Sequence, residues 1–269
     1  MVTTPRILII AGSDPSGGAG LQADLKTATR LGCYAGTAVT SLTVQNTKGV
    51  QAVEPVSPQL ITAQIKAVLS DIGADAIKIG LLPSQDVIKA VFETLTDLAP
   101  DLPRVVDPVL VATSGGHLTV QDTRAAMLDY GVGGSILTPN FDEAAALTDI
   151  LVQSRATMEQ AGDRLIRRGA DAVIVTGGHS SGDDCLDLLV TGLGAHEIKS
   201  KRVPTKNDHG TGCTYSTALA CFLAKGHGLA DAARRAKLVV LAGLRADPDL
   251  GAGRGPLGHH VMDLSALND

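Results

Sequence analysis

The hexapeptide His209-Gly210-Thr211-Gly212-Cys213-Thr214 is the stretch from which the fold and the chemistry of this chain are inferred first. It leads into the alanine-rich segment 215–224, whose apolar residues recur at helical spacing, so we predict a turn followed by a helix. The first N–H groups of such a helix have no partners within it, and the helix dipole gives this end a positive potential. Two glycines let the backbone pass close to a ligand, which makes the turn a candidate anion site.

Cys213 falls in the first turn of the predicted helix, where the positive potential is expected to lower the pKa of a thiol. A phosphate cradle with an activated thiol beside it leads to the hypothesis of phosphoryl transfer. On the hexapeptide alone an alternative has equal weight, namely an ordinary loop-to-helix turn with Cys213 as a small core residue. The N-terminal part of the chain favours the first interpretation.

Composition and charge exclude several classes of function. Of the 269 residues 44% are hydrophobic, and the net charge of -5 argues against a nucleic-acid or anionic-membrane surface. Aromatic residues make up 2% and tryptophan is absent, which disfavours stacking platforms for single strands. The apolar run 7–11 is too short for a signal sequence or a membrane span, and the four cysteines show no metal-ligand spacing. We therefore expect a cytoplasmic protein with no nucleic-acid or membrane partner.

Short apolar, β-branched runs alternate with amphipathic segments from end to end. With no internal repeat and no long linker, this alternation predicts one three-layer α/β domain over residues 1–269 with a mostly parallel sheet. The predicted parallel strands are 6–11, 37–44, 76–79, 104–111, the run from 135, and 172–175; an antiparallel pair of edge strands follows at 184–190 and 195–203. The predicted helices are 21–30, 58–72, 84–98 with Ser84 as N-cap, the run to 147, 157–168, 215–224 and 229–245.

A glycine-rich turn, residues 12–20, follows the first predicted strand. It fits a dinucleotide fingerprint poorly, because its Gly17-Gly18-x-Gly20 spacing differs from GxGxxG. The turn can instead place Asp14 and backbone amides near a small polar substrate, or it can be a structural turn. Gln45 ends the second predicted strand, where its amide is able to donate and accept at the edge of a heterocycle, although it can equally be a loop amide.

Two carboxylates stand out further along the chain. Asp107 interrupts an apolar strand, where a carboxylate is costly unless it is paired or metal-bound, so it is a candidate Mg²⁺ or phosphate-end residue. The alternative is a satisfied N-cap or turn aspartate. Glu143 lies in the first turn of a predicted helix, a position that suits both capping and a metal. The polar segment 112–118 fits a lid or an ordinary loop. The adjacent His259 and His260 in a glycine-rich tail are expected to be solvated, with no site assigned.

Several segments together resemble one family over nearly the whole chain. The segment 11–26, AGSDPSGGAGLQADLK, is similar to the N-terminal signature of bacterial hydroxymethylpyrimidine/phosphomethylpyrimidine kinases of thiamine synthesis, which belong to the ribokinase-like superfamily. Further motifs follow in the family's order: Gln45-Asn46-Thr47, Lys78-Ile79-Gly80, Val105-Val106-Asp107-Pro108, Thr138-Pro139-Asn140, Gly177-Gly178-His179, the 209–214 hexapeptide and Gly255-Pro256-Leu257-Gly258-His259.

The resemblance implies a ribokinase-like three-layer α/β/α fold and a homodimer. It implies ATP- and Mg²⁺-dependent phosphorylation of 4-amino-5-hydroxymethyl-2-methylpyrimidine, and then of the monophosphate to the diphosphate. By position, the resemblance assigns contacts with the pyrimidine to Gly12, Asp24, Gln45, Gly80 and Val109, and Mg²⁺ binding to Asp107 and Glu143. It assigns an anion hole to Gly210, Thr211 and Gly212, with Cys213 as the proton acceptor. Contacts with the nucleotide are assigned to Asn140, Gly178, Thr211 and Lys237. From periodicity alone, Asp24 belongs to a solvated helix face.

Two positions depart from the family's pattern, and other functions remain open. Thr176 and Thr113 stand where the family often has lysine, which removes positive charge that can contact phosphates and bears most on the second phosphorylation.

A pyridoxal kinase is the alternative enzyme. Some pyridoxal-specific relatives have a cysteine in the lid, whereas this chain has no cysteine between Val109 and Leu118. A sugar kinase is disfavoured because Cys213 replaces an aspartate. A binding protein that has lost turnover is the alternative outside enzymes.

Overall fold

The computed structural model describes residues 4–109, 120–178 and 182–267, and its strands form a single sheet. Nine strands of the described residues follow the order β3-β2-β1-β4-β5-β6-β7-β8-β9. The pairs from β2 through β7 are parallel, whereas β3, β8 and β9 pair antiparallel to their neighbours. The strands are β1 Arg6–Ser13, β2 Tyr34–Asn46, β3 Gly49–Pro55, β4 Ala76–Ile79, β5 Arg104–Val106, β6 Ile136–Leu137, β7 Ala172–Val175, β8 Asp184–Thr191 and β9 Gly194–Lys201.

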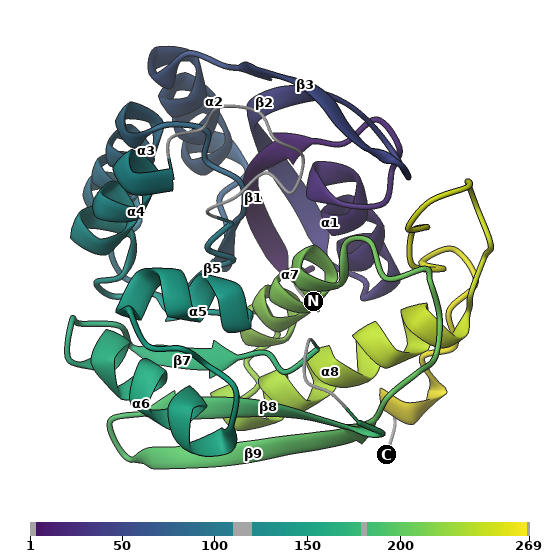
Figure 1. Ribbon diagram of the computed structural model, residues 1–269. Helices are drawn as coiled ribbons and strands as arrows, with labels where there is room; N and C mark the ends of the chain where they lie inside the picture. The colour runs from purple at the N-terminus through teal and green to yellow at the C-terminus, as the bar shows by residue number, and fades with distance from the viewer. Residues whose placement is uncertain (1–3, 110–119, 179–181, 268–269) are drawn as a thin grey trace.

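Helices cover both faces of this sheet, so the predicted three-layer α/β architecture with a mostly parallel sheet is confirmed. Figure 1 shows α1, α7 and α8 on one side of the central strands and α2 and α3 on the other. The helices are α1 Gly20–Arg30, α2 Pro58–Asp71, α3 Gln85–Leu98, α4 Val120–Ala126, α5 Phe141–Thr148, α6 Arg155–Ile166, α7 Thr211–Ala224 and α8 Leu229–Arg245, with a π-helical turn Met127–Gly131 and a 3-10 turn Ser265–Leu267.

Two hydrophobic cores lie on the two faces of the sheet because side chains alternate along each strand. In β1, Leu8 and Ile10 belong to the core formed with α2, α3, α5 and α6. Their neighbours Ile7 and Ile9 belong to the core formed with α1, α7 and α8. The central strands are thus apolar on both sides, which explains why they read as continuous apolar runs.

Local signals fix several helix starts. The Ser84 side chain accepts a hydrogen bond from the backbone N–H of Val87, as predicted for an N-cap. Asn140 and Glu143 form a reciprocal capping box at the start of α5.

The structure also differs from the prediction in particular elements. β3, α4 and the π-helical turn were not predicted. β5 ends at Val106, so Asp107 follows the strand rather than interrupting it. β8 pairs with both β7 and β9, so only β9 of the predicted edge pair lies at an edge. No helix within the described residues is long and apolar enough to cross a membrane.

Candidate active site

The carboxyl ends of the parallel strands meet at one edge of the sheet, where polar residues gather. A cavity of about 490 Å³ opens there. Ten of the predicted site residues line it: Asp107, Val109, Asn140, Glu143, Gly178, Gly210, Thr211, Gly212, Cys213 and Lys237. The lining formed by the described residues does not include the other four, Gly12, Asp24, Gln45 and Gly80. The topology therefore brings together the predicted anion, metal and nucleotide residues.

The turn before α7 is held against the N-terminal glycine-rich turn. Gly210 is the N-cap of α7 and has φ of 87°, a left-handed conformation that favours glycine. A Cβ at this position would overlap the carbonyl oxygen of Gly18. The start of this 14-residue helix also approaches Asp107, whose Oδ2 would lie 3.4 Å from a Cβ on Gly212. The positive end of α7 therefore faces both the cavity and a carboxylate.

Cys213 does not have the lowered pKa that its position in the helix predicted. Burial raises the pKa of its thiol to about 12, and the negative charges of Asp24 and Asp107 act in the same direction. The positive charge of Lys78 and a backbone contact at Gly20 oppose them without reversing the shift. The prediction was wrong because it considered only the local helix end, whereas burial and nearby carboxylates decide the protonation state.

Asp107 and Glu143 are two carboxylates beside the same cavity. Burial raises the pKa of Asp107 to about 6 although Lys78 lowers it, and burial together with the charge of Asp107 raises the pKa of Glu143 to about 8. A bound cation would stabilise the ionised form of both carboxylates, and Mg²⁺ is typically held by one or two carboxylates plus substrate phosphates. The donor set therefore fits Mg²⁺, although the described residues contain no group of three or more potential ligand side chains.

Glu143 has a capping role as well. Its Oε2 accepts a hydrogen bond from the backbone N–H of Asn140 at 2.9 Å, so both functions considered for this residue are open to it.

Sequence reasoning missed a buried ion pair beneath Cys213. Lys78 and Asp24 are both 0% exposed, with Nζ and Oδ2 2.8 Å apart, and Thr217 of α7 donates to Asp24 Oδ1 at 2.7 Å. The negative charge of Asp24 raises the pKa of Lys78 against the effect of burial. The solvated helix face expected for Asp24 was wrong, and its contact with the pyrimidine stays a prediction. A lysine inside the buried four-residue strand β4 was the available signal, because such a charge needs a partner.

Gly12 and Gly80 occupy strand ends that have little space for a side chain. A Cβ on Gly12 would lie 2.6 Å from Ser41 Oγ, and one on Gly80 would lie 2.8 Å from Lys78 Nζ. Both glycines thus have a packing role, and their contact with substrate stays a prediction.

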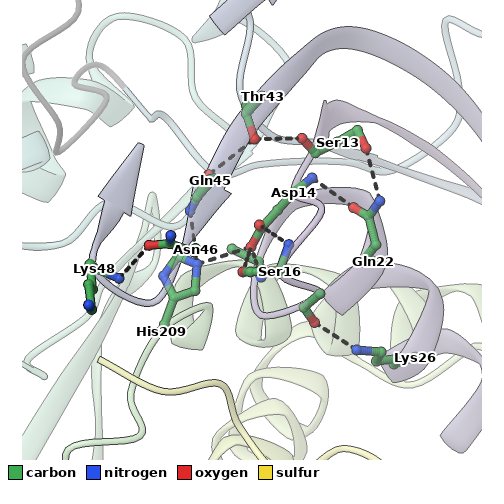
Figure 2. Close-up of polar contacts among 12 residues, drawn as sticks. Ser13, Asp14, Ser16, Gln22, Lys26, Thr43, Gln45, Asn46, Lys48 and His209 are labelled. Carbon is green, nitrogen blue, oxygen red and sulfur yellow. Dashed lines mark hydrogen bonds and ion pairs between the residues drawn. The ribbon is translucent and has the colours of Figure 1, made fainter. Parts of the chain in front are cut away.

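Gln45 joins a polar network that links the two glycine-rich turns (Figure 2). His209 Nε2 lies 3.0 Å from Gln45 Nε2 and 3.1 Å from Asp14 Oδ2. Burial alone would raise the pKa of Asp14, but hydrogen bonds from His209, Ser16 and Ala19 outweigh it and lower the pKa to about 2. Since His209 lines the cavity, the network connects Gln45 to its wall.

Lys237 lies at the α8 side of the cavity. Its ammonium group is 2.8 Å from Asp187 Oδ2 and donates to Cys185 Sγ at 3.1 Å, so its charge is already paired. Thr176 also lines the cavity, and its backbone N–H donates to the carbonyl of Pro139. Thr113 and the predicted lid 112–118 lie outside the described residues.

His259 is buried rather than solvated, which corrects the prediction for this histidine. It is 1% exposed and hydrogen-bonds Thr214 of α7 through Nε2 at 2.8 Å. The adjacent His260 is exposed, as expected. The C-terminal segment is thereby fixed to the helix that carries Cys213.

The fold and cavity define the class as that of solved α/β vitamin kinases. An ADP complex of Bacillus subtilis pyridoxal kinase aligns with a TM-score of 0.89 at 32% identity, covering 96% of this chain and 98% of that one. The sequence profile of phosphomethylpyrimidine kinase matches residues 14–258. The chain belongs to the phosphomethylpyrimidine kinase family, which confirms the resemblance found in the sequence.

Two relatives show how the chain compares in length. Hydroxymethylpyrimidine/phosphomethylpyrimidine kinase of Rhizobium meliloti is 43% identical over 256 residues, covering 94% of this chain and 96% of that protein. The thiamine biosynthesis bifunctional protein ThiED of Geobacter sulfurreducens is 42% identical over 269 residues, covering 98% of this chain. This chain spans only 54% of that bifunctional protein.

Proposed function

We propose that this protein is an ATP- and Mg²⁺-dependent kinase that phosphorylates 4-amino-5-hydroxymethyl-2-methylpyrimidine and then its monophosphate in thiamine biosynthesis. The observation that carries the proposal is the cavity that unites the α7 anion turn with Asp107, Glu143 and Cys213. Family membership and 43% identity to a relative of that name support the substrate. We also propose that residues 1–269 act as one kinase domain, since the described strands share one sheet.

The proposed chemistry depends on positioning and charge neutralisation. Phosphoryl transfer asks little covalent work of a protein, so donors aimed at the transferred group contribute most. The Gly210, Thr211 and Gly212 backbone would bind the transferring phosphoryl group at the positive end of α7. Asp107 and Glu143 would hold Mg²⁺, which neutralises phosphate charge when bound.

Cys213 would take the proton of the substrate hydroxyl, with Lys78 as the nearby positive charge that favours its thiolate. A thiol with a pKa of about 12 is protonated at neutral pH, so this role requires the bound ligands to shift the balance of charge.

Nucleotide contacts are proposed for Asn140, Gly178, Thr211 and Lys237, which all line the cavity. For substrate, Gly12, Asp24, Gln45, Gly80 and Val109 are proposed contacts; of these, Val109 lines the cavity and Gln45 reaches it through His209.

A homodimer in the cytoplasm is part of the proposal. Leu42 and Val44 are 56% and 55% exposed on one face of β2, which suits an interface between copies of the chain. Sedimentation analysis of wild type and Leu42→Glu tests this: a monomeric wild type would contradict the dimer.

A pyridoxal kinase is the second candidate, because the TM-score of 0.89 is to a pyridoxal kinase. The lower identity to that enzyme, 32% against 43%, ranks it second.

The test is ATP consumption by the purified protein with Mg²⁺, with the hydroxymethylpyrimidine and pyridoxal side by side and products resolved by mass. Formation of the pyrimidine diphosphate would support the whole proposal. It would also show that both phosphorylations proceed with threonine at positions 113 and 176. Monophosphate alone would contradict the second phosphorylation. Turnover of pyridoxal only would replace the substrate, and nucleotide binding without turnover of either would contradict the enzyme assignment.

A further inference from the structure

The side-chain amide of Gln45 has a polar contact at each end, and together these contacts determine which end is oxygen. As drawn in Figure 2, the amide Nε2 lies 3.0 Å from His209 Nε2 and the amide Oε1 lies 3.3 Å from Thr43 Oγ1. The nitrogen and oxygen of an amide have nearly the same size, so the hydrogens of its neighbours decide its orientation.

Asp14 determines whether the ring nitrogen Nε2 of His209 carries a hydrogen. Its carboxylate is 2% exposed and also accepts from the backbone N–H groups of Ser16 and Ala19 and from Ser16 Oγ, at 2.8 to 2.9 Å. An ionised carboxylate can only accept, so the contact of Asp14 Oδ2 with His209 Nε2 at 3.1 Å requires a hydrogen on that nitrogen. The same N–H can be shared with Gln45 only if Gln45 presents its oxygen.

The contacts of Thr43 lead independently to the same orientation of the Gln45 amide. Its hydroxyl has one hydrogen, and the carbonyl oxygen of Ser13, 2.9 Å away, can only accept it. Toward Gln45 the hydroxyl is therefore an acceptor, so the amide nitrogen belongs at that end, where the side chain as placed carries Oε1. Both neighbours select the orientation with oxygen toward His209 and nitrogen toward Thr43, which exchanges the amide oxygen and nitrogen relative to Figure 2.

We propose that Asp14, acting through His209, and Thr43 at the other end hold the Gln45 amide in one orientation, so that it reads the amino group and adjacent ring nitrogen of the substrate. The network uses one N–H and one lone pair of the amide and leaves one of each. That remaining pair matches an aminopyrimidine edge, as glutamine matches adenine. The inference rests on the proposed function and adds Asp14, His209 and Thr43 as positioning residues.

The inference predicts which analogue the site rejects. Replacing the 4-amino group by a 4-oxo group reverses donor and acceptor along that edge of the ring. A fixed amide cannot follow the reversal, whereas a freely rotating amide can. Discrimination between the two pyrimidines therefore measures how firmly the amide is held.

The experiment compares the 4-amino substrate with its 4-oxo analogue in wild type, Asp14→Asn and Thr43→Val. We expect the ratio of kcat/KM values to fall about 10-fold in each variant, mainly through KM, which is the size expected for one bidentate contact. Calorimetric binding of both pyrimidines gives a readout apart from turnover. Asp231→Asn is the matched control, because Asp231 contacts His227 at 2.8 Å on α8, outside the site, and should leave the ratio unchanged.

A double-mutant cycle separates positioning from a purely structural effect. In a Gln45→Ala background, Asp14→Asn and Thr43→Val should no longer change the ratio. Unchanged ratios in the single variants, or changes that persist without Gln45, would overturn the inference. Thr43→Val keeps the test decisive if Asp14→Asn fails to fold. A wild type that binds neither pyrimidine would instead overturn the proposed function, and the inference would fall with it.

Discussion

Lys78→Met is expected to destabilise the protein strongly, because it leaves the carboxylate of Asp24 buried without its cation. Both side chains are 0% exposed and their charged atoms are 2.8 Å apart. Removing one partner of such a pair typically costs about 3–5 kcal/mol of unfolding free energy. The remaining hydrogen bond from Thr217 satisfies one oxygen of Asp24 but supplies no charge. Urea unfolding followed by circular dichroism measures the loss.

The double variant Lys78→Met/Asp24→Leu tests the reason for this loss. Without either charge, no unpaired ion remains, so the double variant should be clearly more stable than the sum of the two single effects predicts. Additive effects would refute the reasoning. Arg6→Met is the matched control, since Arg6 and Asp75 form an ion pair at the same 2.8 Å but with 42% and 35% of their side chains exposed. Its effect should be far smaller.

Three further predictions follow from the site and its surroundings. Cys213→Ser should lower kcat by about 10²–10⁴-fold while pyrimidine binding, measured by calorimetry, changes less, as expected for loss of a general base. Gly210→Ala should abolish most turnover, because its φ of 87° and the carbonyl of Gly18 leave no place for a methyl group; steady-state kinetics and thermal unfolding report both effects. Burial lowers the pKa of His259 from 6.5 to about 4. Between pH 6.5 and pH 4, His259 is therefore protonated in the unfolded chain but neutral in the folded chain. Stability should therefore fall by about 3 kcal/mol as pH drops from 6.5 to 4, and His259→Gln should flatten this dependence in urea unfolding.

Each of these predictions has an outcome that contradicts it. Near-normal turnover of Cys213→Ser would remove Cys213 from the base role. A normal Gly210→Ala enzyme would show that the turn is not confined by Gly18. Unchanged pH dependence in His259→Gln would assign the loss of stability at acid pH to other groups. Lys66→Ala, at an exposed position of α2, serves as a neutral control for all three variants.

The sequence by itself determined the order of most strands and helices, β3 and α4 excepted, and the positions of several candidate site residues along the chain. Periodicity separates elements because burial of one face repeats every 3.6 residues in a helix and every two in a strand. Gly210 and Ser84 were found for local reasons, a glycine turn at a helix start and a helix cap. Asp107 was found because a carboxylate inside an apolar run is costly, although the structure places it just after β5.

Only the tertiary structure decided which side chains meet and in what charge state. Asp24 pairs with Lys78 54 residues away, and Asp14 contacts His209 195 residues away. No periodicity encodes such pairs, because they depend on how the sheet and its crossovers stack. The thiol of Cys213 shows the consequence most directly. Its place at a helix start predicts a low pKa, yet burial together with the charges of Asp24 and Asp107 raises that pKa.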